Sequence, residues 1–126
     1  YSTAPSGMPS VQHSLLAVLE MVHEGDLELV EVPRITSHSV AKRFDIKERG
    51  FIREGFWADL VLVNMNDNYE VKKEKIFYKC GWSPFESYTF KSRIVETIIN
   101  GERVCSQGKI LSDKIGQKLE FSRGYK

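Results

Sequence analysis

Cysteine is scarce in this 126-residue chain: Cys80 and Cys105 lie 25 positions apart, without a CxxC spacing. Small proteins that rely on disulfides carry more cysteines than this. The two thiols are therefore expected to be reduced, as is typical of a cytoplasmic protein. Cys105 falls in a predicted strand, where a free cysteine behaves as a small apolar side chain.

An excess of charge of one sign is also missing, since 18 Lys and Arg residues face 17 Asp and Glu residues. Nucleic-acid-binding proteins usually gather basic side chains on one face, so no nucleic-acid partner is expected. No stretch approaches the roughly 20 apolar residues that span a bilayer, and no membrane contact is expected. The first residues, YSTAPS, lack the basic and apolar blocks of a secretion signal.

Motifs for metal binding, acyl transfer and nucleotide binding are absent too: the sequence has no HxH, HExxH, GxSxG, GxGxxG or Walker pattern. The histidines are His13, His23 and His38. His13 and His23 are about 80° out of alignment on an ideal helix, which disfavours a shared ion. All three are predicted to be structural or exposed to solvent, with His38 making hydrogen bonds that cap a short helix.

The first part of the chain has helical periodicity. Residues 1–9 are predicted to form a loop, after which Ser10 caps a helix whose apolar residues recur every three or four positions (Val11, Leu15, Val18, Leu19 and Val22). Gly25 is expected to end this helix in the left-handed conformation, and Asp26 to cap the next one. Residues 27–37 are weakly helical, and Pro33 predicts a kink or a late start. Ser37 or Ser39 is then expected to cap a short helix that reaches Phe44.

From Gly50 onward the pattern changes to strands and turns. Strands are predicted at 51–52, 58–64, 69–71, 93–99 and 102–105, with turns at 54–55, 66–68, 100–101 and 107–108. The apolar run 60–63 predicts a strand that is covered on both sides. Asn100-Gly101 is the strongest hairpin signal. Residues 80–87, CGWSPFES, are predicted to form an aromatic loop, and residues 113–126 a loosely held polar tail.

Two places could carry chemistry. Asp59, in the segment WADL, is a carboxylate at the mouth of a strand, where a general base can stand. We favour the structural alternative, in which it accepts backbone N–H groups in a turn. The second place is the loop 4–9, which runs directly into a helix. Gly7 lets the backbone approach a ligand closely, and N–H groups near a helix start favour anions.

Four segments, taken together and in order, resemble the C-terminal part of a dihydroorotase of the amidohydrolase superfamily. They are PSGMPSVQHSLLAVLE, ITSHSVAKRFDI, RGFIREGFWADLVLVN and KCGWSPFESYTFKSRIVETIINGERV. The third matches a superfamily signature, whereas the fourth narrows the resemblance to dihydroorotases. Two positions depart from the pattern: Ser39-Val40 replaces the usual Asn-Pro, and Asp45 replaces a glycine. The chain also starts without Met, which suggests a piece of a longer protein.

The resemblance implies an α+β arrangement. Residues 1–47 would supply the final loop and helices of a (β/α)8 barrel, residues 48–112 strands of a small composite β-sandwich, and residues 113–126 a polar C-terminal tail. In such a barrel two zinc ions activate a hydroxide that opens or closes the cyclic amide of dihydroorotate in pyrimidine biosynthesis. The catalytic residues and metal ligands would lie upstream of this chain. Only the backbone of Ser6 and Gly7 would contact the substrate.

The expected partners follow from the same resemblance. They are the rest of the parent enzyme chain, the small substrate dihydroorotate and, in a homo-oligomer, further copies of the protein. The piece alone is expected to be inactive and to self-associate. One alternative is an allantoinase or hydantoinase, which would share ADLVLV without WSPFE. Another is a non-catalytic amidohydrolase-like subunit of an assembly. A third is a free-standing β-rich interaction module.

Overall fold

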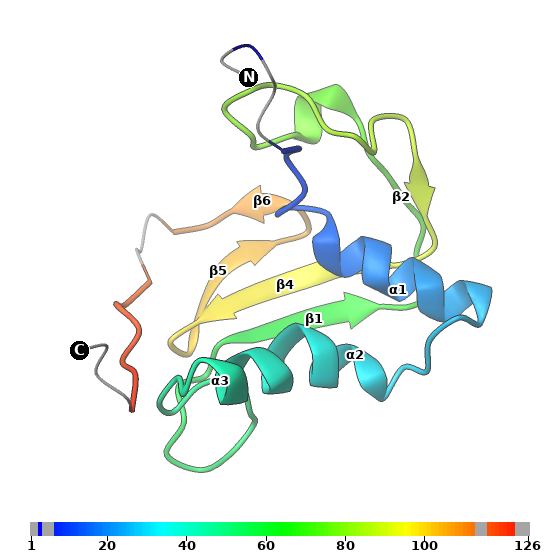
Figure 1. Cartoon of the computed structure of the whole chain (residues 1–126). Helices are drawn as coiled ribbons and strands as arrows, with labels where there is room; N and C mark the ends of the chain where they lie inside the picture. The colour runs from blue at the N-terminus through cyan, green and yellow to red at the C-terminus, as the bar shows by residue number, and fades with distance from the viewer. Residues whose placement is uncertain (1–2, 4–6, 113–115, 123–126) are drawn as a thin grey trace.

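The structure is a computed structural model that describes Thr3 and residues 7–112 and 116–122. The helical elements come first in the chain (Figure 1): α1 (Ser14–Glu24), α2 (Glu31–Pro33), a π-helical turn (Arg34–His38) and α3 (Ser39–Arg43). The later elements are β1 (Leu60–Asn64), β2 (Tyr69–Glu70), a 3-10 turn (Lys73–Lys75), β3 (Thr89–Phe90), β4 (Arg93–Ile99), β5 (Glu102–Ser106) and β6 (Lys109–Ile110). The helices end at Arg43 and the first strand begins at Leu60, so helices precede strands as the sequence predicts.

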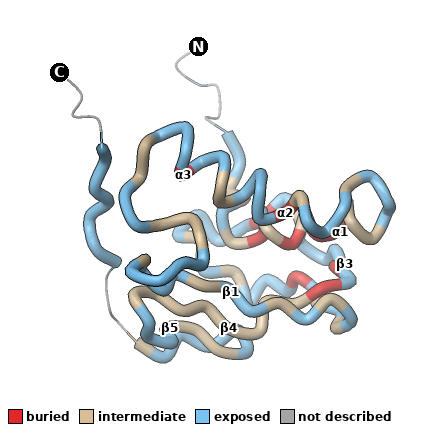
Figure 2. The backbone as a smooth tube through the Cα atoms, turned by 90° about the horizontal axis from the view of Figure 1, so that it is seen from below, coloured by how far each residue is buried: buried red, intermediate tan, exposed pale blue. Residues whose placement is uncertain are grey.

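The described strands form two antiparallel sheets. One has the order β1-β4-β5-β6, and the other pairs β2 with β3. Figure 2 shows α1, α2 and α3 together on one side of β1, β4 and β5. The molecule is therefore layered, helices against sheet. Among the described residues, no helix is long and apolar enough to cross a membrane.

Helix α1 starts later than the sequence predicts and ends as predicted. Ser10 does not cap it: the carbonyl of Ser10 accepts the His13 N–H (3.0 Å) in a preceding turn, and the helix begins at Ser14. Gly25 ends it with a φ of 85°. The Asp26 N–H then bonds to the carbonyl of Met21 (2.9 Å). Asp26 thus closes α1 in a Schellman-type end and does not start the next helix, which corrects that prediction.

The second helical segment starts late, as Pro33 predicts. It begins at Glu31, so Pro33 lies in the first turn, where its missing N–H interrupts no helical bond. The chain then runs through the π-helical turn into α3 without a break, and neither Ser37 nor Ser39 caps a helix. The hydroxyl of Ser37 instead donates to the carbonyl of Gly50 (3.0 Å).

Two predictions are wrong, namely the strand at 51–52 and the capping hydrogen bonds of His38. One side-chain contact accounts for both. The rings of His38 and Phe51 stack on each other, with centroids 4.4 Å apart and an interplanar angle of 8°. The guanidinium of Arg53 also lies over the Phe51 ring, at 4.6 Å. These side-chain contacts attach the segment to the helices, and residues 51–52 form no strand.

The buried core lies between α1 and the smaller sheet. Its members are large apolar side chains from separate elements (Leu16, Leu19, Val32, Val71 and Phe90). Each such side chain contributes about 1.5–3 kcal/mol when fully buried. The core therefore joins α1 to the segments on either side of the aromatic loop 80–87.

Strand β1 is shorter and less covered than predicted. Adjacent residues of a strand point to opposite faces, yet Val61 and Leu62 are 46% and 45% exposed. The described residues thus leave both faces of β1 partly open. The hairpin β4–β5 is as predicted: Asn100 and Gly101 both have positive φ, 52° and 81°, as a type I′ turn requires. Gln107 and Gly108 form the next turn in the same way.

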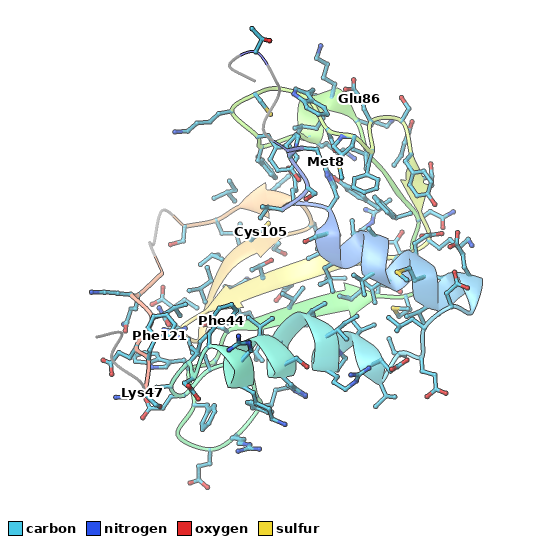
Figure 3. The ribbon with its side chains drawn as sticks, in the orientation of Figure 1. Met8, Phe44, Lys47, Glu86, Cys105 and Phe121 are labelled. Carbon is cyan, nitrogen blue, oxygen red and sulfur yellow. The ribbon has the colours of Figure 1, made fainter. Side chains whose placement is uncertain are left out.

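The described part of the C-terminal tail is held in place, contrary to the prediction. The Lys47 N–H donates to the carbonyl of Glu120, and the Ser122 N–H to that of Asp45, both at 2.9 Å. Phe121 forms a bridge with Ile46, and Figure 3 shows Phe44, Lys47 and Phe121 close to one another. The aspartate at 45 takes a φ of 52°, a conformation that glycine adopts without cost.

Candidate functional site

The candidate site is the loop that leads into α1. Ser6 lies outside the described residues. Gly7 is exposed and has a φ of 76°, and no atom of the described residues lies within 4 Å of the position of a Cβ. Its backbone is thus accessible to a ligand. Met8 is also exposed and lies on the same side of the molecule as the loop that carries Glu86 (Figure 3).

The end of this loop is held firmly at Gln12. The Gln12 N–H donates to the hydroxyl of Tyr78 (2.7 Å). The side-chain amide of Gln12 donates to the carbonyl of Lys75 (2.8 Å) and accepts the N–H of Phe77 (2.9 Å). Gln12 therefore makes hydrogen bonds to Lys75, Phe77 and Tyr78, which lie more than 60 residues away in the sequence.

His13 continues this attachment inside the protein. It is 1% exposed, and its Nδ1 is 3.1 Å from the hydroxyl oxygen of Ser83, which also accepts the N–H of Phe85. The rings of Tyr69, Tyr78, Phe85 and Phe90 surround it, with centroids at 5.9–6.4 Å. Burial lowers the pKa of His13 below its ordinary value. Its Nε2 is buried and has no hydrogen-bond partner among the described residues.

The histidines do not converge on a metal site. His13 is enclosed by aromatic rings, His23 bonds through Nε2 to the hydroxyl of Ser92 (2.8 Å), and His38 stacks on Phe51. Within the described part of the chain, no group of three or more His, Cys, Asp or Glu side chains could hold an ion. The residues described here therefore do not fit the zinc pair that the resemblance implies.

Asp59 has the structural role that we favour. Its carboxylate accepts the N–H of Asn100 (2.8 Å) and pairs with Arg49, whose guanidinium also lies over the ring of Trp57. Asp59 thus fastens the start of β1 to the hairpin tip. A hollow of about 380 Å³ lies beside it, lined by Glu48, Gly55, Phe56, Trp57, Ala58 and Asn100. Among the described residues that line this hollow, Glu48 is the one acidic or nucleophilic side chain.

Sequence reasoning missed the roles of Gln12, Tyr78 and Ser83. The hydrogen bonds of Gln12 and His13 to the segment of Tyr78 and Ser83 join residues 63 to 70 positions apart, which no local pattern reveals. The available signal was the resemblance itself. The segment WSPFE, which narrows it to dihydroorotases, contains the serine that His13 contacts.

No protein-family model matches this chain. It is 30% identical to a dihydroorotase from Pyrococcus abyssi over 114 residues, 90% of this chain and 28% of the relative. It is 32% identical to an allantoinase from Desulfitobacterium hafniense, again over 90% of this chain and 25% of the relative. The L-hydantoinase (dihydropyrimidinase) from Arthrobacter aurescens superposes with a TM-score of 0.82 at 25% identity, over 92% of this chain and 26% of its own.

The chain thus spans about a quarter of the length of the relatives that it matches. It is the C-terminal portion of an amidohydrolase-superfamily protein. The mixed helix-and-sheet fold of this amidohydrolase portion agrees with that of its structural relatives. Relatives named dihydroorotase and allantoinase both match it, so the similarity is to cyclic amidohydrolases in general.

Proposed function

We propose that this chain is part of a zinc-dependent cyclic amidohydrolase and that the substrate of the whole protein is dihydroorotate. The observation that carries the proposal is the match to dihydroorotases over 90% of the chain, together with the WSPFE segment. In the whole protein the metal pair would supply an activated hydroxide for opening the ring. The metal ligands and catalytic groups would belong to parts of the protein outside this chain.

The resemblance of the sequence to dihydroorotases supports a division of the chain into three parts. Residues 1–47 would close the (β/α)8 barrel, and residues 48–112 would supply strands of the β-sandwich. The tail, residues 113–126, would return to the helical part, because Glu120 and Ser122 pair with residues 45–47. In this arrangement the loop 4–9 is the part of the chain that meets the substrate, as the ends of barrel strands do.

The contribution of this chain to the reaction would come from its backbone. Ser6 and Gly7 would place main-chain groups against the cyclic amide. Gly7 is suited to this, because its left-handed conformation and the open space around it let a planar ring approach. The chain by itself would be inactive.

An allantoinase is the second candidate, and a specific observation favours it. The Desulfitobacterium hafniense allantoinase is 32% identical over the same length, slightly more than the Pyrococcus abyssi dihydroorotase. Both enzymes, by their names, act on small cyclic ureides or imides, so the chemistry would be the same and the ring substituents would differ.

Turnover by the full-length protein tests the proposal. Initial rates of hydrolysis would be measured for dihydroorotate, allantoin and hydantoin at equal concentrations, with metal-depleted protein as the control. We expect dihydroorotate to give the highest kcat/KM. A preference for allantoin or hydantoin would select the second candidate, and no turnover of any ring would favour a non-catalytic assembly subunit.

The same proposal places the protein in the cytoplasm, with both cysteines free. Its partners would be the rest of the parent chain and further copies of the whole protein. Exposed apolar side chains on separate elements offer surfaces for both, among them Val30 at 72% and Ile52 at 89%. Sedimentation of the isolated chain tests this, since a stable monomer at high concentration would contradict it.

A further inference from the structure

We propose that Gln12 and His13 are positioning residues, which clamp the end of the substrate-facing loop onto the segment 72–87 and so fix the backbone at Gly7. This inference rests on the proposed function. It adds residues to which that function assigned no role. Neither side chain would touch the substrate.

The clamp at Gln12 is built from three hydrogen bonds that leave little freedom. One uses the backbone N–H and the Tyr78 hydroxyl, and two use the side-chain amide and the backbone at Lys75 and Phe77. A side-chain amide that both donates to and accepts from the same distant backbone is fixed in orientation as well as in position. Gln12 is therefore held to the 72–87 segment at three points.

The clamp at His13 fixes the same segment from inside. The His13 ring is enclosed by four aromatic rings and contacts the Ser83 hydroxyl. The Nε2 of this buried ring has no hydrogen-bond partner among the described residues, and an unsatisfied buried polar atom is destabilising. The contact with Ser83 offsets part of this cost and holds the start of α1 to the 72–87 segment.

Among the described residues, the loop before Gln12 has few hydrogen bonds. None is made by residues 7–9, and no described atom lies within 4 Å of a Cβ at Gly7. Pro9 stiffens the connection, because its ring fixes one backbone angle. In the described chain, the first hydrogen bonds after Gly7 to a distant segment are those of Gln12, five residues later.

Removal of single hydroxyl or amide groups tests the clamp in the full-length protein. Tyr78→Phe deletes the acceptor of the Gln12 N–H, and Gln12→Met deletes both side-chain bonds at similar volume. The matched control is Tyr88→Phe, directly after this segment, because the Tyr88 hydroxyl has no hydrogen-bond partner among the described residues. Steady-state kinetics on the preferred cyclic amide, zinc content and melting temperature would be measured for each.

We expect each clamp variant to raise KM about 3- to 10-fold while kcat stays within about twofold, because the loop holds the ring equally in the ground and transition states. Tyr88→Phe should match the unmodified protein. Hydrogen exchange should also become faster at the amides of Gln12 and His13 in Tyr78→Phe and stay unchanged in α1. Should Gln12→Met not fold, Tyr78→Phe carries the test, since it keeps the ring.

An unchanged KM in Tyr78→Phe, with or without a lower melting temperature, would show a structural role only and overturn the inference. A fall in kcat at constant KM would overturn it too. These results differ from failure of the proposed function, in which the unmodified full-length protein hydrolyses no cyclic amide at all.

Discussion

Gly50 is the position where one added methyl group should do the most damage. It follows α3 in the chain and has a φ of 81°. A Cβ built there would lie 2.4 Å from the Cβ of Ala41, which is buried in α3, and 3.3 Å from the carbonyl oxygen of Ser37. Relief would require α3 to move away from the segment that carries Phe51.

The cost of Gly50→Ala has two parts. A side chain in the left-handed region costs about 1 kcal/mol or more, and overpacking against a fixed neighbour costs about 1–3 kcal/mol. Gly55→Ala is the matched control, because Gly55 has a φ of 79° but nothing within 4 Å of its Cβ. We therefore expect Gly50→Ala to lower the free energy of unfolding by about 1–3 kcal/mol more than Gly55→Ala.

Urea unfolding of the purified chain, followed by the fluorescence of Trp57 and Trp82, measures this difference at constant m-value. The reasoning would be refuted if the two variants were destabilised equally. Equal losses would mean that Gly50 does not pack against α3.

Two further predictions concern charge. Burial lowers the pKa of His13 in the folded state. As the pH falls below about 6.5, the unfolded chain therefore takes up a proton before the folded chain does. The contribution of His13 to stability should be complete above that pH and decline below it. Melting temperatures from pH 8 to 5 should show a steeper decline than in His13→Gln, and parallel curves would contradict this. Asp59→Asn should cost about 1–2 kcal/mol, since it leaves the Arg49 guanidinium, 11% exposed, without its charge partner. Asp67→Asn, which breaks the more exposed pair with Arg93, should cost under about 1 kcal/mol in the same urea assay, and equal costs would refute the argument.

The hairpin and the end of α1 could be predicted from the sequence because each depends on local chemistry. Asn100-Gly101 allows two consecutive residues with positive φ, and few other pairs do so at low cost. Gly25 likewise permits the left-handed turn that closes α1. In both places the backbone conformation depends on the residues that adopt it, so the local sequence is enough to predict it.

The start of α1 and the segment at Phe51 could not be predicted in this way. Ser10 has the chemistry of a cap, but His13 is drawn into an aromatic enclosure from residues 69–90, and the chain turns before the helix begins. Phe51 and Ile52 have strand propensity, but the Phe51 ring stacks on His38 instead. Contacts with distant residues decided both outcomes.

The candidate site also has one part that the local sequence predicts and another part that depends on distant contacts. Gly7 was predicted from the loop and from the resemblance, and its exposed left-handed backbone is compatible with the predicted role. That role stays a prediction, and Ser6 lies outside the described residues. Gln12 and His13 carried no local signal, because the groups that form hydrogen bonds with them lie 63 to 70 residues further along the chain.

The central claim is that this chain supplies backbone and packing to a metal enzyme whose ions are held elsewhere. Zinc analysis tests it most directly, by elemental measurement on the full-length protein and on residues 1–126 alone after the same dialysis. We predict about two tightly held ions in the full-length protein and none on the isolated chain. Stoichiometric zinc retained by residues 1–126 alone would contradict the account.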